Sequence, residues 1–318
     1  MRQIQFDASM ADDDSLDTDA EVEKRRASVY SVEALRAASQ VDKIYVNHPS
    51  FASAVHALDR IFQLAPELDM PQGMLLTGPT GSGKTTVFKY FSNSLPPSSF
   101  FAPGFGAISI RCTKRPSAGF LIGALLRTYR YPFSTGTGKQ LYARREVVFD
   151  AIREKKTRLL FLDEAGGLLS PRDKLVVDNG ETDVTDFLRE LMDTCRVGVV
   201  MATKLGAGVL DTLDDALASR ISVRQSIQTF KPNEEWQGMM NAIVKQCKTF
   251  DVGLISTPGI AKKLNLATNG NLRGFKRLLA EAILIAYDAE KFVLSEVILA
   301  KAFVRVYGEQ VGRPNVFQ

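Results

Sequence analysis

Short apolar segments alternate with amphipathic ones between residues 74 and 227. The short segments predict five strands, at 74–77, 107–112, 158–163, 197–202 and 222–227. Helical spacing between them predicts helices at 86–91, 119–129, 141–155, 183–196 and 205–219. The segment 158–163 (RLLFLD) has a continuous apolar centre, as in a strand that is buried on both faces of a parallel sheet. Strands that alternate with helices predict an α/β fold with a parallel sheet flanked by helices.

The pattern changes on both sides of this region. After residue 230, helical spacing at 234–250, 258–267, 272–288 and 294–307 predicts a small all-helical domain, and Lys231-Pro232-Asn233 marks the boundary. Before the first strand we expect a short helix at 32–38, an extended polar segment at 42–49 and a helix at 50–64 with Ser50 as its N-cap. We therefore expect a tail at 1–30, an α/β domain at 31–230 and a helical lid at 231–318.

Composition adds few constraints to this picture. The 318 residues are 45% hydrophobic and 24% charged, which is typical of a globular protein. No apolar run approaches the roughly 20 residues that span a bilayer, and the first residues lack the pattern of a signal peptide. We therefore expect a cytoplasmic protein without membrane contact. Cys112, Cys195 and Cys247 are widely spaced and are expected as buried, reduced thiols.

The charge is distributed unevenly along the chain. Residues 1–23 hold eight acidic side chains against Arg2, a net charge of −7, so the remainder of this +4 chain carries +11. An acidic segment with few aromatic residues predicts disorder. The basic remainder is compatible with nucleic-acid binding.

Candidate chemistry begins directly after the strand at 74–77. The sequence there fits G-x-x-x-x-G-K-[ST] at every fixed position, between a predicted strand and a predicted helix. Backbone N–H groups of such a loop surround phosphates; Lys84 would reach the β- and γ-phosphates, and the Thr85 hydroxyl would bind Mg²⁺. The predicted nucleotide-binding residues are Gly78, Pro79, Thr80, Gly81, Ser82, Gly83, Lys84, Thr85 and Thr86.

Two acids end the strand at 158–163. Because ligands gather at the carboxyl ends of parallel strands, we expect Asp163 to hold Mg²⁺ together with Thr85. Glu164 would polarise the water that attacks the γ-phosphate. Thr203 ends the next strand, where its hydroxyl either orients this water, senses the γ-phosphate, or is a simple strand-end or N-cap threonine.

Two arginines are placed where a cation could meet phosphates. Arg220 lies between the helix at 205–219 and the last strand, a position from which it would reach a neighbouring subunit's nucleotide as an arginine finger. Arg273 begins a helix of the lid and could close onto the phosphates of its own subunit. Arg277, one turn further on, is the alternative for that role.

Taken together, these features resemble AAA+ ATPases of the initiator-like branch, and in particular transposon ATPases of the TniB or TnsC type. The resemblance covers about residues 40–290 and is carried by DKIYVNHPSFASAVHALDRI, RLLFLDEAGGLL and NGNLRGFKRLLAEA. It implies ATP and Mg²⁺ as cofactors, and oligomers on duplex DNA that link target selection to a transposase and disassemble on hydrolysis. The implied partners are duplex DNA, further copies of the chain in a ring or filament, a transposase subunit and a target-selection protein of the TniQ type. Gly166-Gly167 stand where relatives often carry a polar or charged residue, and the loop expected at 166–181 is long, so the trigger of hydrolysis stays open.

Basic and hydroxyl side chains follow the strand at 107–112. In similar initiator-like ATPases this region faces the central channel and follows DNA phosphates. The candidate DNA contacts are Lys114, Arg115, Thr137 and Lys139, with Arg144 and Arg145 nearby. Tyr129, Tyr131 and Phe133 either stack on bases or pack the end of the preceding helix.

Three other functions compete with this interpretation. A replication initiator or helicase loader would normally add a C-terminal winged helix, and only about 30 residues follow the helix at 272–288. A small-molecule kinase would not explain Glu164, Arg220 and a helical tail together. A scaffold that is locked by nucleotide would not need Glu164.

Overall fold

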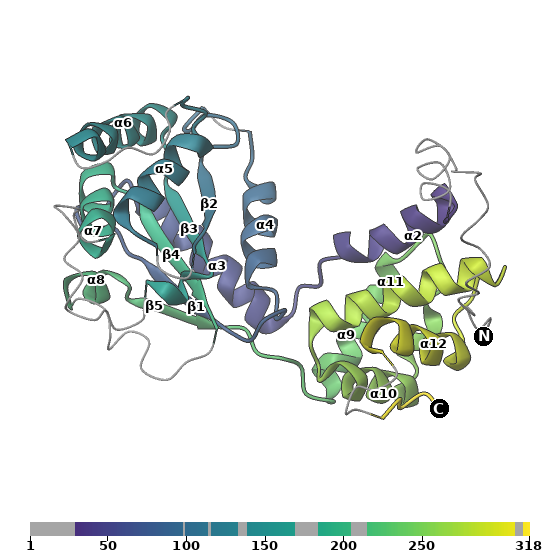
Figure 1. Ribbon diagram of the computed structural model, residues 1–318. Coiled ribbons are helices and arrows are strands. Elements are labelled where there is room, and N and C mark those ends of the chain that lie inside the picture. Colours follow the sequence, from purple (N-terminus) through teal and green to yellow (C-terminus); the bar gives the residue numbers. More distant parts are fainter. Residues whose placement is uncertain are drawn as a thin grey trace, which may run out of the picture.

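The computed structural model describes residues 29–97, 99–113, 116–132, 139–168, 184–204, 215–308 and 314–318. Its centre is a parallel sheet of five strands in the order β2-β3-β4-β1-β5 (Figure 1). The strands are β1 (Met74–Thr77), β2 (Ala107–Arg111), β3 (Leu159–Asp163), β4 (Gly198–Thr203) and β5 (Val223–Ser226). The predicted parallel α/β sheet is confirmed, with each strand boundary within one or two residues.

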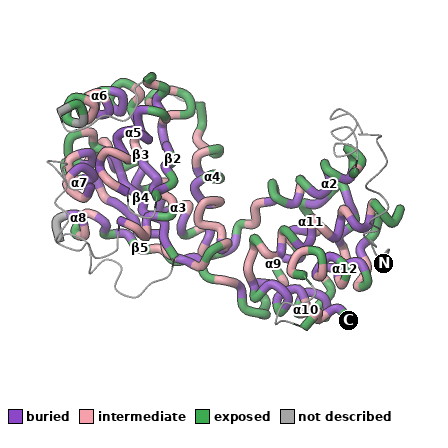
Figure 2. Tube along the Cα trace, viewed as in Figure 1, coloured by how far each residue is buried: buried purple, intermediate pink, exposed green. Residues whose placement is uncertain are grey.

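Helices cover both faces of the sheet. One face carries α3 (Pro49–Leu64) and α4 (Lys84–Ser94), and the other carries α5 (Ala118–Thr128), α6 (Lys139–Lys155), α7 (Val184–Cys195) and α8 (Asp215–Arg220). Side chains of each strand alternate between the two cores: Leu75 packs on the α5–α8 side, and Met74 and Leu76 pack on the α3 side. Both cores are buried (Figure 2). The result is a three-layer α/β/α domain.

A helical bundle adjoins this domain. It contains α9 (Glu234–Gln246), the short 3₁₀ helix Gly253–Ser256, α10 (Pro258–Thr268), α11 (Leu272–Asp288) and α12 (Glu296–Tyr307). The helix α2 (Val32–Lys43) belongs to the same core, because Ala37 and Val41 pack together with Phe275 of α11. The predicted boundary between an α/β domain at 31–230 and a helical lid at 231–318 stays a prediction. The structure adds that the bundle draws its helices from both ends of the chain.

Several helices begin one or two residues from the predicted start, and two of these differences lie close to the predicted phosphate loop or change a predicted cap. Ser50 is not the N-cap of α3, because the helix begins one residue earlier, at Pro49, with His48 as its N-cap. The fixed φ of proline suits the first helical position, and the Ser50 hydroxyl lies 3.0 Å from Nδ1 of His48 instead. The helix α4 begins at Lys84, directly after Gly83, whose φ of 110° ends the preceding loop.

Other predicted segments are only partly described. The helix predicted at 205–219 corresponds to α8, and residues 205–214 lie outside the described residues. Of the predicted loop at 166–181, residues 169–181 lie outside them too. No helix among the described residues is long and apolar enough to cross a membrane.

Candidate nucleotide-binding site

The loop between β1 and α4 has the geometry of a phosphate cradle. A Cβ atom at Gly78 would lie 2.2 Å from the carbonyl oxygen of Ile227, so only glycine lets the chain pass there. Gly81 and Gly83 have φ values of 82° and 110°, which other residues rarely adopt. The loop therefore reaches the start of α4 with its backbone closely curled, as the sequence predicted.

Lys84 lies folded over this loop. Its Nζ donates hydrogen bonds to the carbonyl oxygens of Gly78, at 2.7 Å, and Pro79, at 2.9 Å. Burial lowers the pKa of Lys84, and the nearby Asp163 carboxylate opposes that shift. A polyphosphate would offer this ammonium group charged oxygens in place of neutral carbonyls.

Thr85 and Asp163 are brought together from two elements. The Thr85 hydroxyl donates a 2.7 Å hydrogen bond to Oδ2 of Asp163, across the carboxyl ends of β1 and β3. A hydroxyl and a carboxylate are the oxygen donors that Mg²⁺ prefers. Oγ of Ser82, in the loop itself, is buried without a partner among the described residues, as expected where a ligand supplies one. These residues fit Mg²⁺ and phosphate.

Glu164 follows Asp163 in a left-handed conformation, with φ 56° and ψ 35°. This conformation is uncommon in residues other than glycine, and when it occurs at the end of a strand beside a cavity it fits a functional position. Its carboxylate accepts two hydrogen bonds from Arg111, at 3.1 Å from Nε and 2.8 Å from Nη2. These bonds hold the pKa of Glu164 below its ordinary value. The sequence analysis missed Arg111, although it ends the strand next to β3 in register with Asp163.

Thr203 occupies the position between the two halves of the site. It ends β4, in register with Thr77 of β1, and β4 lies between β1 and β3. Its side chain is buried, and a Cβ atom at Gly166 would lie 3.1 Å from its hydroxyl. Lys204 follows at the mouth of the cavity and is a second residue that the sequence analysis missed; its charge acts on both Lys84 and Glu164.

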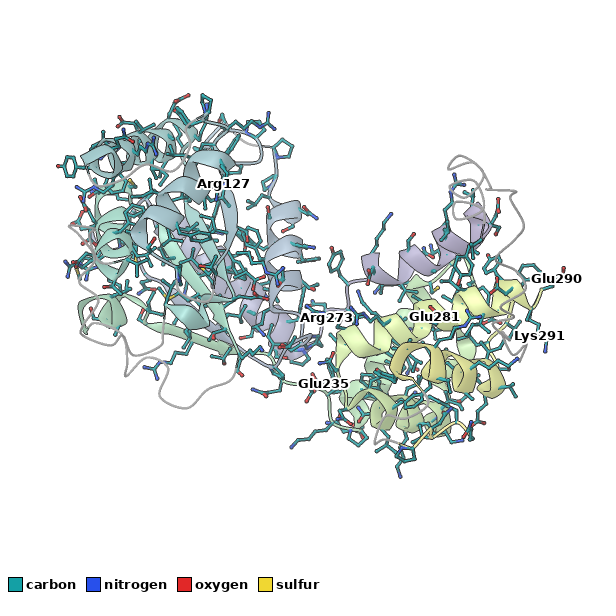
Figure 3. All side chains as sticks on the ribbon, viewed as in Figure 1. Arg127, Glu235, Arg273, Glu281, Glu290 and Lys291 are labelled. Carbon is teal, nitrogen blue, oxygen red and sulfur yellow. The ribbon has the colours of Figure 1, made fainter. Side chains whose placement is uncertain are left out.

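The helical bundle closes the site from the other side. Figure 3 labels Arg273 where the bundle meets the α/β domain, and its backbone N–H donates a 3.2 Å hydrogen bond to the Gly81 carbonyl. Asn271, the N-cap of α11, donates a 2.7 Å hydrogen bond to the Thr80 carbonyl. Arg273 lines the cavity, whereas its alternative Arg277 is not among the described residues that line it.

The cavity between these groups has a volume of about 1100 Å³, enough for a nucleotide. Beyond the phosphate loop it is lined by Tyr45, Val46 and His48 and by Lys276 of α11. Nζ of Lys276 donates hydrogen bonds of 2.9 Å to the carbonyls of Asp42 and Ile44, and burial lowers its pKa. Lys276 therefore ties the segment after α2 to the bundle. No cluster of three His, Cys, Asp or Glu side chains that could bind a metal exists among the described residues.

Arg220 lies away from this cavity. Its guanidinium donates hydrogen bonds to Asp193 on α7, at 3.0 Å from Nε and 2.7 Å from Nη2. Within the described part of the chain it does not line the nucleotide cavity. Its role toward a neighbouring subunit stays a prediction.

The predicted DNA contacts are mostly outside the described residues. The residues outside the described part are Lys114, Arg115, Phe133 and Thr137. Lys139 is the first residue of α6. Arg145 is a structural cation: it pairs with Glu190 at 2.7 Å, lies over the Tyr142 ring and is 11% exposed. Tyr129 is buried with its hydroxyl 2.7 Å from that of Thr157, so it packs the helix end and cannot stack on bases.

Solved structures with the same architecture include ORC and Cdc6 proteins. The structure of the Aeropyrum pernix ORC1 protein in complex with DNA superposes with a TM-score of 0.59 at 17% identity, over 82% of this chain and 66% of that chain. The Aeropyrum pernix ORC2 protein gives 0.57 at 16% identity, over 81% and 68%. Cdc6p from Pyrobaculum aerophilum gives 0.56 at 16% identity, over 83% and 69%. This chain thus spans just under two thirds of the ORC1 length, and the likeness shows a shared P-loop AAA+ fold.

Sequence comparison is more specific. No curated protein sequence matches the chain. The sequence model of the bacterial TniB protein matches residues 36–231, from α2 to the end of the α/β domain, including the phosphate loop, Asp163 and Glu164. Since this match covers more than half of the chain and the fold agrees with it, the protein belongs to the TniB family.

Proposed function

We propose that this protein is an Mg²⁺-dependent ATPase that binds duplex DNA and regulates DNA transposition. One observation carries the proposal: Lys84, Thr85, Asp163, Glu164 and Thr203, which come from three separate strands or their loops, line one cavity that Arg273 closes. Such a set is what hydrolysis of a γ-phosphate requires. Membership of the TniB family supports the transposition context.

Each residue has a definite task in this proposal. Lys84 and Arg273 bind the β- and γ-phosphates and offset their charge. Thr85 and Asp163 would hold Mg²⁺, which would supply positive charge against the phosphate oxygens. Glu164 accepts a proton from the attacking water. The oxygen of that water bonds to the γ-phosphorus, and the bond between the γ-phosphorus and the ADP oxygen breaks. Thr203 orients this water.

Assembly completes the proposal. Arg220 lies beside the amino end of β1, where its carbonyl accepts from Gly73, whereas the phosphate loop follows the carboxyl end of β1. Because Arg220 is thus distant from its own cavity, we assign it to the site of an adjacent copy. The +11 charge of residues 24–318 supports binding to DNA phosphates. ATP would then stabilise a ring or filament on duplex DNA that links a TniQ-type target-selection protein to the transposase, and hydrolysis would release it.

Electron micrographs of the protein with duplex DNA test this directly. We expect ordered assemblies with a non-hydrolysable ATP analogue, few with ADP, and none in the Lys84→Ala variant, which lacks the phosphate contact. The matched control is Lys262→Ala, an exposed lysine of α10 that is not among the described residues lining the cavity. Assemblies formed equally well by Lys84→Ala would refute the nucleotide-dependent part of the proposal.

A replication initiator or helicase loader is the second candidate, because the solved structures named above are initiators. The two functions differ in the protein that the DNA-bound assembly recruits. Retention of the transposase, without retention of a replicative helicase, on assemblies formed with the ATP analogue supports the transposition role. The opposite result supports the second candidate.

A further inference from the structure

The strand β2 forms an open edge of the sheet. It pairs with β3 on one side only. The Gly106 carbonyl accepts from Arg158 and the Cys112 N–H donates to Asp163, so the even-numbered residues of β2 direct their backbone groups toward β3. The backbone groups of Ser109 and Arg111 therefore point outward, and in the described part of the chain they have no hydrogen-bond partner.

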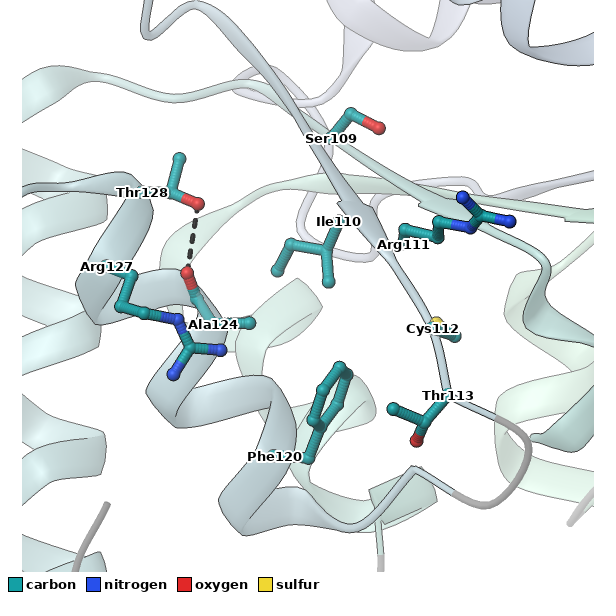
Figure 4. Close-up of a pocket in the computed structure, with 9 residues that line it drawn as sticks. All are labelled: Ser109, Ile110, Arg111, Cys112, Thr113, Phe120, Ala124, Arg127 and Thr128. Atoms are coloured by element: carbon teal, nitrogen blue, oxygen red, sulfur yellow. Dashed lines mark hydrogen bonds between the residues drawn. The ribbon is translucent and has the colours of Figure 1, made fainter. Parts of the chain in front are cut away.

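A groove runs along this edge, between β2 and α5 (Figure 4). Its volume is about 590 Å³, and it is open to solvent. Ile110 points toward α5, where it and Ala124 form a largely buried apolar floor, Phe120 is a partly exposed apolar side chain, and Arg127 lies at the rim. Arg111 points to the other side of the strand.

The backbone of the edge determines which kind of ligand fits. Ser109 and Arg111 each present one N–H donor and one C=O acceptor. A phosphodiester offers acceptors only and would leave the carbonyls unpaired, whereas an extended peptide matches both groups. The apolar surface beside the edge favours a peptide with apolar residues at every second position, and the two arginines favour acidic neighbours.

The chain itself contains such a peptide. Residues 2–7 (RQIQFD) place Ile4 and Phe6 on one face of a strand and Gln3, Gln5 and Asp7 on the other. Residues 1–28 lie outside the described residues. We propose that residues 2–7 add to the open edge of β2 as a further strand, with Ile4 and Phe6 against Ile110 and Phe120 and with Asp7 on the side of Arg111.

The link between the two partners allows this docking within one chain. Residues 8–28 form a connection of 21 residues to α2, which can extend to about 70 Å. Because α2 lies in the bundle, the connection has to span the whole molecule, and a chain of 318 residues is about 50 Å across. Tethering also gives an effective concentration on the order of millimolar. A subunit's own segment should therefore occupy the groove in preference to that of a second copy.

Hydrogen exchange of single amides tests the proposal without reference to ATP hydrolysis. In the full chain we expect the amides of Ser109 and Arg111 to exchange at least about tenfold more slowly than in the Ile4→Asp/Phe6→Asp variant, the factor for a docking energy near 1.4 kcal/mol. The amide of Ile110, which faces β3, should not change. A synthetic peptide of residues 2–10 should restore protection to the variant.

A matched variant separates the apolar contact from charge. Gln3→Asp/Gln5→Asp adds the same charge to the same segment but keeps Ile4 and Phe6, and it should retain the protection. Equal exchange of Ser109 and Arg111 in wild type and in Ile4→Asp/Phe6→Asp would overturn the proposal. Protection that falls on tenfold dilution would overturn its intramolecular form, because docking within one chain does not depend on concentration.

Discussion

The guanidinium of Arg111 holds the carboxylate of Glu164 through two hydrogen bonds, at 3.1 and 2.8 Å. Glu164 is the residue that would accept the proton of the attacking water. While both of its oxygens are paired and the pKa of its carboxyl is lowered, it is a weaker base toward water. In the proposed mechanism, the pair would therefore restrain hydrolysis.

We expect Arg111→Ala to raise the basal ATPase rate. The pair is exposed, with 74% and 58% of the two side chains accessible, so the gain should not exceed about fivefold. Steady-state turnover at saturating ATP measures this gain. The turnover of Arg111→Lys should lie between those of wild type and Arg111→Ala, because lysine keeps the charge but cannot make the bidentate contact. A large loss of turnover in Arg111→Ala would instead place Arg111 among the phosphate-binding groups.

Glu164→Gln should retain ATP binding but lose hydrolysis by on the order of a hundredfold, because the amide cannot accept the proton. Fluorescent nucleotide titration and phosphate release measure the two effects separately. Glu154→Gln, an exposed acid at the end of α6, serves as the control. Turnover near that of wild type would show that Glu164 only ends the strand.

DNA binding should depend steeply on salt and little on sequence. A Lys114→Ala/Arg115→Ala variant should weaken binding to every duplex about equally and reduce the slope of log K against log salt by up to roughly two. Anisotropy titrations at several salt concentrations measure this. Arg144→Ala/Arg145→Ala should act differently, since Arg145 is paired inside the fold and its loss should lower stability first. A defect limited to one sequence would point to base readout.

Arg220→Ala should bind ATP normally and fail to hydrolyse it. Subunits with Lys84→Ala keep Arg220, and subunits with Arg220→Ala keep the phosphate loop, so a mixture should recover part of the activity that each lacks. Asp193→Ala is the control for the Arg220–Asp193 contact, because a stability defect from losing that pair would appear in both variants. If Arg220→Ala alone hydrolyses ATP at the wild-type rate with DNA present, Arg220 is not the arginine finger. Arg224 would then be the next residue to test for that role.

Stability should fall in mild acid because of His48. Burial lowers its pKa from 6.5 to about 4. Between pH 6.5 and pH 4 the unfolded chain binds more protons than the folded one. The contribution of neutral His48 to the free energy of unfolding is therefore complete above pH 6.5 and is lost as the pH falls toward 4. At pH 5 the loss should be about 2 kcal/mol. Urea unfolding at pH 7 and pH 5 should show this difference in wild type and in the exposed-site control His56→Gln, and a smaller one in His48→Gln.

Local signals made much of the site predictable. The spacing from Gly78 to Thr85 fixes a loop whose geometry is determined by its own glycines. Asp163 and Thr203 follow from topology, because the carboxyl ends of parallel strands lie at one edge of a sheet. No contact distant in sequence has to be known for these residues.

Other features depend on register and packing that a single sequence does not reveal. Arg111 reaches Glu164 only because β2 pairs with β3 so that Arg111 lies opposite Asp163. The alanine-rich face of α2 is equally compatible with packing on a sheet or on a helix, and it packs on α11. Ser50 is a good capping residue in isolation, but Pro49 starts the helix before it.

The position of α2 has a mechanical consequence. Because the bundle is built from both ends of the chain, the polypeptide crosses between the two bodies twice, at 44–48 and again near Phe230. The two crossings touch, with the rings of His48 and Phe230 4.8 Å apart. Two connections that meet at one place act as a pivot: they permit the bundle to swing but resist its sliding or separating. We therefore expect the bundle to open and close over the proposed nucleotide by rotating about this place, so that parts of the bundle far from His48 and Phe230 move most.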